Sequence, residues 1–205
     1  MGSYLNPGNK GFQESLNSEI YVDKTGLIEK TNEVLDTRQK FLCVSRPRRF
    51  GKSMAADMLA AYYERGEDSA ELFGTLKISK VESYEKNRNQ YDIIKVNMQE
   101  FLSMTHSMDE MLSMLQKYLI FDLTDHFDNV RFRDENNLIQ VMKDIYSKTK
   151  HSFVILIDEW DCLFREYQQD QEAQKKYLDF LRAWLKDKDY VALAYMTGIL
   201  PIKKY

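Results

Sequence analysis

The chain has 205 residues, 43% of them hydrophobic and 30% charged, with a formal net charge of -3. This length suits one sizeable α/β domain, and the balance of residues excludes a wholly disordered chain. The net charge also excludes a protein that binds polyanions by bulk electrostatics alone. The N-terminus has no basic stretch followed by an apolar one, and no apolar run reaches membrane-spanning length. We therefore expect a soluble cytoplasmic protein with no membrane partner.

Residues 1–37 read as an N-terminal segment that packs on a core formed by residues 38–205. Turn residues gather at Asn6-Pro7-Gly8-Asn9, and a short apolar element surrounds Ile20-Tyr21-Val22. The spacing of apolar residues from Gly26 to Leu35 predicts a short helix.

The first informative pattern is a strand, a basic loop and a helix in direct succession. The apolar run Phe41–Ser45 predicts a buried strand. The loop RPRRFGKS follows at residues 46–53. Residues 54–66 contain good helix formers with apolar positions at helical spacing.

Apolar runs and helical spacing alternate along the second half of the chain. Three more runs are nearly all apolar, which is typical of strands buried on both faces. Three longer stretches carry apolar residues at helical spacing. The predicted strands are Tyr91–Met98, Phe153–Ile157 and Tyr190–Met196, and the predicted helices span residues 108–127, 135–149 and 172–186. The apolar face of the last helix consists of Tyr177, Leu178, Leu181 and Leu185.

Buried strands that alternate with helices predict a three-layer α/β domain with a mainly parallel sheet. In such domains the binding crevice lies at the carboxyl ends of the strands. The sequences RPRRFGKS, DEWD and TG stand at three of those ends. We therefore expect them to meet in one site.

The loop RPRRFGKS has the second half of a phosphate-binding loop. Gly51, Lys52 and Ser53 fit the end of GxxxxGK[ST], in which lysine reaches the β- and γ-phosphates and the hydroxyl binds Mg²⁺. Arg46 occupies the place of the first glycine, whose backbone angles arginine reaches only at a cost. A basic solvent-exposed loop is the alternative. The expected nucleotide-binding residues are Arg46, Pro47, Arg48, Arg49, Phe50, Gly51, Lys52, Ser53 and Met54.

The acidic residues after the predicted strand Phe153–Ile157 complete a magnesium-nucleotide site in this interpretation. Asp158 would hold Mg²⁺, through water or with Ser53, and Glu159 would polarise the attacking water. Thr197 ends the last predicted strand and would sense the γ-phosphate, so Lys52, Glu159 and Thr197 form the expected catalytic set. Each has a plainer alternative, because acidic residues often end a strand and Thr-Gly often begins a turn.

Several motifs together resemble the bacterial AAA-ATPase-like family, a branch of the P-loop NTPases. They are YLNPGN and YVDKT near the start, RPRRFGKS, LIDEWD and TGILPI, and they span almost the whole chain. The resemblance implies an AAA/ASCE-type ATPase core, in which an arginine-rich loop is itself typical. Members of the family usually continue into further helices and a nuclease-like domain. Since this chain stops at Tyr205, we expect the last core strand, the helical lid and the nuclease-like domain to be missing.

Two clusters keep more than one interpretation. Arg46, Arg48 and Arg49 would neutralise γ-phosphate charge, anchor the loop to acidic residues at neighbouring strand ends, or contact nucleic-acid phosphates. The segment Asp23-Lys24-Thr25 would cover the nucleotide base or, through Asp23, cap the helix that begins near Gly26.

We therefore expect a domain that binds ATP and Mg²⁺ and, in the complete protein, hydrolyses ATP by in-line attack of water. ATP is preferred over GTP because the family resemblance favours it and the guanine motif Asn-Lys-x-Asp is absent. One alternative is a regulatory or scaffold module that binds nucleotide without turnover. Another is the ATPase part of a nucleic-acid-processing system. A protein partner or a second copy of the chain is compatible with each of these functions.

Spacing indicates no disulfide or zinc chemistry. Cys43 and Cys162 lie far apart, each in or beside an apolar run, so we expect two buried free thiols. His106, His126 and His151 form no HxxxH or Cys/His group, and we assign no zinc site.

Overall fold

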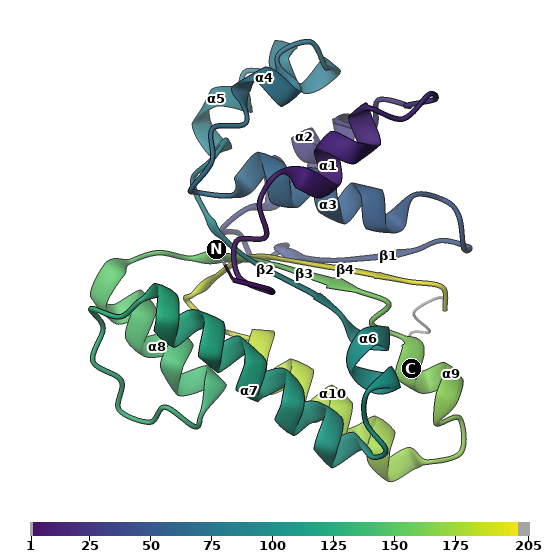
Figure 1. Cartoon of the computed structure of the whole chain (residues 1–205), viewed down its shortest axis with the longest axis vertical. Helices are drawn as coiled ribbons and strands as arrows, with labels where there is room; N and C mark the ends of the chain where they lie inside the picture. The colour runs from purple at the N-terminus through teal and green to yellow at the C-terminus, as the bar shows by residue number, and fades with distance from the viewer. Residues whose placement is uncertain (1, 201–205) are drawn as a thin grey trace.

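A computed structural model describes residues 2–200 and contains a four-stranded parallel sheet in the order β1-β4-β3-β2 (Figure 1). Each strand pairs in parallel with its neighbour, so all four carboxyl ends point to one edge of the sheet. β4 therefore lies between β1 and β3, the two strands that precede the basic loop and the acidic pair. The strands are β1 (Phe41–Ser45), β2 (Asp92–Asn97), β3 (Phe153–Asp158) and β4 (Val191–Gly198).

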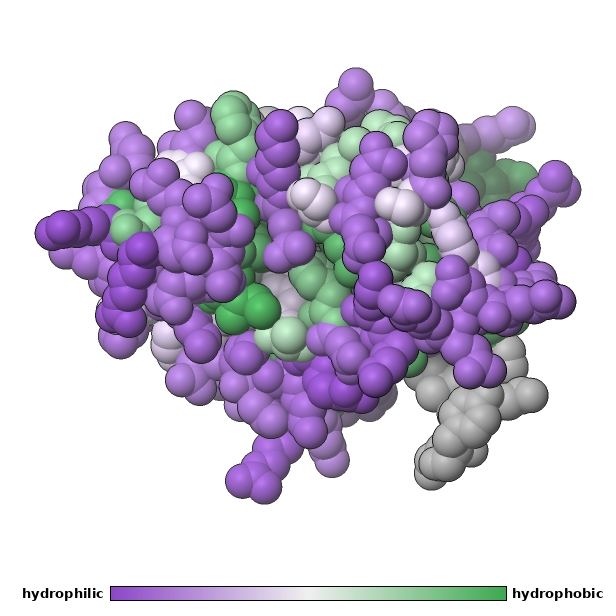
Figure 2. Space-filling model, turned by 90° about the horizontal axis from the view of Figure 1, so that it is seen from below, coloured by the Kyte–Doolittle hydropathy of each residue, from purple (hydrophilic) through white to green (hydrophobic). Residues whose placement is uncertain are grey.

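Helices cover both faces of the sheet (Figure 1). On one face lie α1 (Lys10–Leu16), α2 (Gly26–Val34), α3 (Lys52–Tyr63), α4 (Ala70–Phe73), the 3-10 turn η1 (Lys77–Lys80) and α5 (Tyr84–Asn87). On the other lie α6 (Met98–Ser103), α7 (Met108–His126), α8 (Leu138–Thr149), α9 (Cys162–Glu166) and α10 (Gln171–Leu185). Viewed from the side of α7 and α8, the surface is mostly hydrophilic, with apolar residues gathered near its middle (Figure 2).

Side chains that alternate along the strands build two hydrophobic cores, one on each face of the sheet. Ile93 and Leu156 pack with α3 on one face, and Ile94 and Ile155 pack with α7 and α8 on the other. All four are fully buried. Each such side chain contributes roughly 1.5–3 kcal/mol relative to an exposed one. The sheet is therefore packed from both sides, which fixes where its carboxyl edge lies.

The N-terminal segment is bonded to the edge strand β2 and packs into the hydrophobic core that contains α3. The backbone N–H of Asn6 donates to the carbonyl of Ile93 at 2.8 Å, and the Asn6 side-chain oxygen accepts the N–H of Ile93 at 2.8 Å. Phe12 stacks on Phe73 with ring centroids 4.8 Å apart. These contacts bring the segment before β1 against the same core cluster as α3.

The four predicted strands and five predicted helices are all present, with small shifts at their ends. Met98 leaves β2 and begins α6, because the Asn97 side chain accepts the N–H of Gln99 as a helix cap. Thr197 belongs to β4 and does not begin a turn. The short apolar element around residues 20–22 has no regular structure, and its Ile20 side chain is 82% exposed.

The predicted apolar face of α10 needs one correction. Tyr177, Leu181 and Leu185 are buried, but Leu178 is 41% exposed, and Trp184 is fully buried in its place. Within residues 2–200, no helix is long and apolar enough to cross a membrane.

Candidate functional site

The basic loop runs from the end of β1 into the N-terminus of α3. Gly51 caps α3 with a φ of 74°, in the left-handed region that favours glycine, and it offers no side-chain acceptor to the helix. Arg49 also has a positive φ, of 68°, but Arg46 does not. The expected backbone cost of arginine at position 46 is therefore absent, because the left-handed angles fall elsewhere in the loop.

Lys52 is the first residue of α3, and the loop wraps around its side chain. Its ammonium donates to the carbonyls of Arg46 and Pro47, each at 3.1 Å, and the residue is 8% exposed. The first N–H groups of a helix have no intrahelical acceptor, so the positive end of α3 and this ammonium face the same loop.

The Asp158 carboxylate is the point where the three sequence motifs meet. It accepts the Ser53 hydroxyl at 2.5 Å, the backbone N–H of Glu159 at 2.9 Å, and the Thr197 hydroxyl. Asp158 and Thr197 are buried, at 6% and 1% exposed. The parallel register brings their strands together, so residues 53, 158 and 197 form one hydrogen-bonded group.

Glu159 lies directly beside this group, but its carboxylate is engaged elsewhere. Its backbone has a φ of 52°, and its side chain accepts a hydrogen bond from Arg165 on α9. Arg165 also lies 3.8 Å from a carboxylate oxygen of Asp161. Arg165 was not predicted from the sequence, because its position six residues after the glutamate carries no motif that identifies it.

Asp161, the last residue of DEWD, orders the chain that follows β4. It is fully buried, and one carboxylate oxygen accepts the backbone N–H groups of Ile199 at 2.7 Å and Leu200 at 2.5 Å. The other oxygen has no hydrogen-bond partner within the described chain. The motif TGILPI ends in Pro201 and Ile202, which lie outside the described residues.

The arginines of the loop are exposed and have no acidic partners. Within residues 2–200, Arg46, Arg48 and Arg49 form no ion pair with Asp or Glu, whereas Arg65, Arg88 and Arg165 do. The interpretation in which they anchor the loop to neighbouring carboxylates is therefore wrong for this structure. Their positive charge remains available to an anion.

The segment Asp23-Lys24-Thr25 lies against the same loop. The Lys24 ammonium donates to the carbonyl of Phe50 at 3.2 Å. Asp23 accepts the N–H of Thr25 at 2.8 Å, and Thr25 already has helical backbone angles, although α2 is assigned from Gly26 onward. This is the type of bond by which a side chain caps a helix start, so it supports the capping interpretation of Asp23.

An apolar pocket of about 330 Å³ adjoins the loop on the side of the N-terminal segment. The segment before β1 supplies one wall, and the loop with the first turns of α3 supplies the other. Its lining residues are Phe12, Ser15, Ile20, Tyr21, Val22, Lys24, Arg49, Phe50, Gly51, Met54, Ala55 and Met58. Phe50 and Met54 are 60% and 41% exposed, so this pocket carries much of the exposed apolar surface near the loop.

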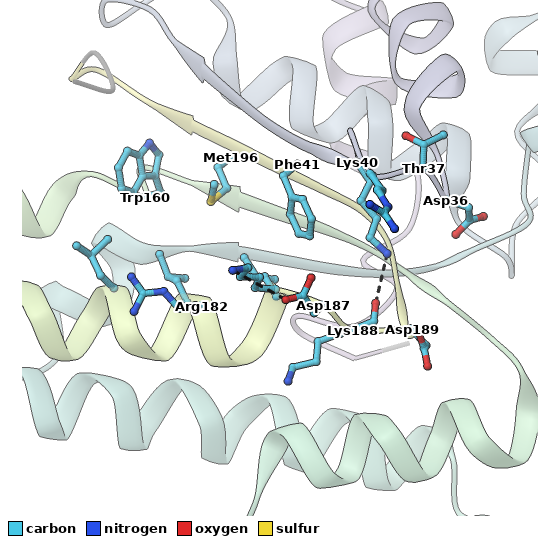
Figure 3. A pocket seen from close by; sticks show the side chains of 15 residues that line it. Asp36, Thr37, Lys40, Phe41, Trp160, Arg182, Asp187, Lys188, Asp189 and Met196 are labelled. Carbon is cyan, nitrogen blue, oxygen red and sulfur yellow. Dashed lines mark hydrogen bonds and ion pairs between the residues drawn. The ribbon is translucent and has the colours of Figure 1, made fainter. Parts of the chain in front are cut away.

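A larger groove of about 1000 Å³ lies between α10 and the sheet (Figure 3). Figure 3 shows Phe41, Met196 and Trp160 on its sheet side and Arg182 on α10. Lys40 closes one end by donating to the carbonyl of Lys188 at 3.3 Å. Trp160 is the only residue of the three motifs that lines this groove. The groups Lys52, Ser53, Asp158 and Thr197 line neither cavity, but the smaller pocket adjoins their loop through Arg49, Phe50 and Gly51.

Neither cysteine belongs to this group as a reactive thiol. Burial raises the pKa of Cys43 to about 11 and that of Cys162 to about 12, so both stay protonated near neutral pH. Both are free. Cys162 is buried as expected, but Cys43 is only half-buried, because β1 lies at the edge of the sheet.

Comparison with known proteins places this geometry in a family. The family model AAA-ATPase_like, described as a predicted AAA-ATPase, matches residues 8–205. The chain belongs to the AAA-ATPase-like family. A search of curated proteins found no match. Membership in the AAA-ATPase-like family suggests the use of a nucleotide and Mg²⁺, and the mixed α/β fold with its parallel sheet agrees with such a role.

Proposed function

We propose that this AAA-ATPase-like chain binds MgATP at residues 46–54 and, in the complete protein, hydrolyses ATP by in-line attack of water. The observation that carries the proposal is the Asp158 carboxylate, which is bonded to both Ser53 and Thr197 beside the Lys52 loop. The strand order β1-β4-β3-β2 supports a P-loop NTPase of the AAA/ASCE type, which has a strand inserted between those of the two motifs. We also propose residues 38–205 as the ATPase core and residues 1–37 as a segment that packs on it.

The charge of the loop supports a polyanionic ligand. Lys24, Arg46, Arg48, Arg49 and Lys52 gather at the N-terminus of α3, where a helix favours negative charge and disfavours positive charge. None of the five forms an ion pair with an acidic residue of the described chain. A triphosphate would relieve their mutual repulsion, and the Lys52 ammonium would exchange two carbonyls for phosphate oxygens.

The donor set fits Mg²⁺. Ser53 and Asp158 present a hydroxyl and a carboxylate oxygen 2.5 Å apart, and Mg²⁺ prefers one or two such protein oxygens together with phosphates and waters. When bound, Mg²⁺ would neutralise charge on the β- and γ-phosphates. The Thr197 hydroxyl, on the other side of Asp158, would orient this carboxylate and report the γ-phosphate.

Glu159 is the group that would take the proton of the attacking water. The water oxygen would bond to the γ-phosphorus, the bond to the bridging oxygen of ADP would break, and the carboxylate would accept the released proton. In the structure this carboxylate is bonded to Arg165. Hydrolysis would therefore require the Glu159 side chain to turn from Arg165 toward the water.

The apolar pocket beside Gly51 would hold the base. Its walls combine Phe12, Tyr21 and Met58 with the exposed Met54, a surface suited to a planar heterocycle. The absence of a guanine motif favours adenine.

The first test is isothermal titration of MgATP and MgGTP into the parent chain and into Lys52→Ala. We expect MgATP to bind the parent and to bind Lys52→Ala at least tenfold more weakly, because a charge-assisted bond contributes about 1.5–3 kcal/mol. Arg38→Ala is the matched control, since it removes an equal charge away from the loop. Equal MgATP affinity of Lys52→Ala and the parent would contradict the proposal.

The engagement of Glu159 by Arg165 favours a second candidate, a nucleotide-binding regulatory module without turnover. Phosphate release by Glu159→Gln separates the two. In an ATPase this variant retains bound ATP and loses phosphate release; in a module without turnover, parent and variant behave alike.

A further inference from the structure

Lys24 lies in contact with the phosphate-binding loop although 26 positions of sequence separate it from Phe50, whose carbonyl it bonds. A Cβ atom placed on Gly51 would lie 3.0 Å from the Lys24 ammonium nitrogen. The ammonium therefore rests on the glycine that caps α3. At this position a bulkier residue than glycine would push it away.

The chain around Lys24 is fixed by a set of hydrogen bonds. The Asp23 carboxylate accepts the Thr25 N–H at 2.8 Å, the Thr25 hydroxyl at 2.6 Å, and the Lys77 N–H at 2.8 Å. The Thr25 oxygen in turn accepts the N–H of Ile78 at 3.1 Å, and Thr25 is fully buried. These bonds join the start of α2 to η1, so the backbone of Lys24 is held in place and only its side chain is free to move.

The position of this ammonium is electrostatically unfavourable without a ligand. It faces the positive end of the twelve-residue helix α3 and shares the loop with Lys52. Lys24 has no ion pair with a carboxylate of residues 2–200. The neutral carbonyl of Phe50 is its bonded acceptor. An anion at the N-terminus of α3 would replace this weak partner by a strong one.

Lys24 also lines the apolar pocket, together with Gly51 and Met54. It therefore lies on the border between the proposed base pocket and the proposed phosphate site. The Lys52 ammonium is bonded instead to the start of the loop, at the carbonyls of Arg46 and Pro47. The two lysines therefore contact different parts of the same loop.

We propose that Lys24 is a second phosphate-binding lysine of this site, supplied from outside the loop, and that it binds the phosphates nearest the base. This inference rests on the proposed nucleotide site and adds a ligand to it. Lys24 exchanges the carbonyl of Phe50 for oxygens of the α- and β-phosphates, which ATP and ADP share. It is a binding residue for the nucleotide and takes no part in proton transfer.

The test compares binding of MgATP, MgADP and adenosine to the parent and to Lys24→Gln by isothermal titration. Loss of one charge-assisted bond at an exposed position weakens MgATP and MgADP by about tenfold each and leaves adenosine unchanged. Lys24→Arg keeps most of the affinity, because the positive charge is kept. Lys30→Gln, which removes an exposed lysine from α2, is the matched control and binds as the parent does.

Three results would overturn the inference. Equal MgATP affinity of Lys24→Gln and the parent, with Lys52→Ala impaired, removes Lys24 from the site but leaves the proposed function intact. An equal loss for adenosine assigns Lys24 to the base. A loss for MgATP alone assigns it to the γ-phosphate. Failure of the proposed function is distinct, because then Lys52→Ala too binds as the parent does. Melting curves of each variant confirm that the compared chains are folded.

Discussion

At the scale of single residues, Arg165 stands between two carboxylates of very different burial. Its side chain and that of Glu159 are 18% and 22% exposed, whereas the Asp161 side chain is fully buried. If Glu159 turns toward a ligand, Asp161 remains beside Arg165 and keeps the guanidinium compensated. Asp161 thus lowers the free-energy cost of turning the Glu159 side chain away from Arg165.

This arrangement predicts unequal effects of removing either partner. Arg165→Gln leaves Asp161 buried without a cation and should lower the free energy of unfolding by about 1–3 kcal/mol. Glu159→Gln keeps the contact between Arg165 and Asp161 and should cost less than about 1 kcal/mol. Urea unfolding of both variants measures the difference. Equal losses of unfolding free energy in the two variants would show that Arg165 does not stabilise the buried Asp161 carboxylate.

Glu64 gives a pH-dependent prediction away from the site. It is 1% exposed, and burial raises its pKa from 4.5 to about 7, although the N–H of Gly8 donates to it at 2.7 Å. A carboxyl with a raised folded pKa contributes stability that is full below the unfolded pKa and is lost as pH rises through the folded pKa. Its share of the stability therefore falls between about pH 4.5 and pH 7.

Glu64→Gln should remove this share, because the amide does not ionise. We expect the free energy of unfolding of the parent to fall relative to that of the variant from about pH 5 to about pH 8. Urea titrations at both pH values measure it. Glu71→Gln, an exposed carboxyl on α4, is the control and should follow the parent. If the free energies of unfolding of the parent and Glu64→Gln differed by the same amount at both pH values, the pKa of Glu64 would not be raised in the folded protein.

At the scale of elements, the end of β4 is the tightest junction in the site. A Cβ atom on Gly198 would lie 2.8 Å from both Asp161 Cγ and Trp160 Nε1, closer than side chains approach one another. Gly198→Ala should therefore displace the Asp161 carboxylate from Ile199 and Leu200, and cost about 1–3 kcal/mol in unfolding free energy. Because Thr197 directly precedes it, we also expect weaker hydrolysis.

Thermal unfolding and phosphate release measure these two effects. Gly26→Ala is a matched control, because nothing lies within 4 Å of its added Cβ and it begins a helix. That variant should be neutral or slightly stabilised. If Gly198→Ala were as stable as Gly26→Ala, the contact with Asp161 would be too loose to order the end of β4.

Elements with strong local patterns were predictable from the sequence, and those formed by distant contacts were not. β3 reads directly from five apolar residues, and α3 from good helix formers after the loop. The helices α4 and α5 have only four residues each, too few for an apolar period to show. Residues 20–22 form no helix or strand, and their apolar composition alone does not show whether a partner surface covers them.

The same distinction holds within the candidate site. The sequence predicted that residues 53, 158 and 197 would meet, because parallel strands bring their carboxyl ends together. It gave no sign of Arg165 or of the contact between Lys24 and Phe50, which depend on how α9 and the N-terminal segment fold back. It also placed the backbone cost of the loop at Arg46, whereas Arg49 and Gly51 take the left-handed angles.

At the scale of the whole molecule, the cations of the loop form a positive cluster on a protein that is acidic overall. The net charge is -3, yet five cations that have no carboxylate partner within residues 2–200 lie at the N-terminus of α3. An extended polyanion such as nucleic acid would meet this patch and also the acidic remainder of the surface, whereas a compact triphosphate would meet the patch alone. The charge distribution therefore favours the nucleotide over nucleic acid as the ligand of the loop.

Ligand binding at this loop should stabilise the entire fold, because β3 and β4 contribute to both hydrophobic cores. MgATP at a hundred times its Kd would add about 2.7 kcal/mol to the unfolding free energy. For a chain of this size, that raises Tm by about 5–10 °C in a single transition.

Lys52→Ala should lose this increase in Tm. ATP with a chelator should give a smaller increase, since Asp158 and Ser53 then lack their metal. A shift of equal size with and without Mg²⁺ would separate nucleotide binding from the proposed metal site and leave Asp158 as a structural link between Ser53 and Thr197.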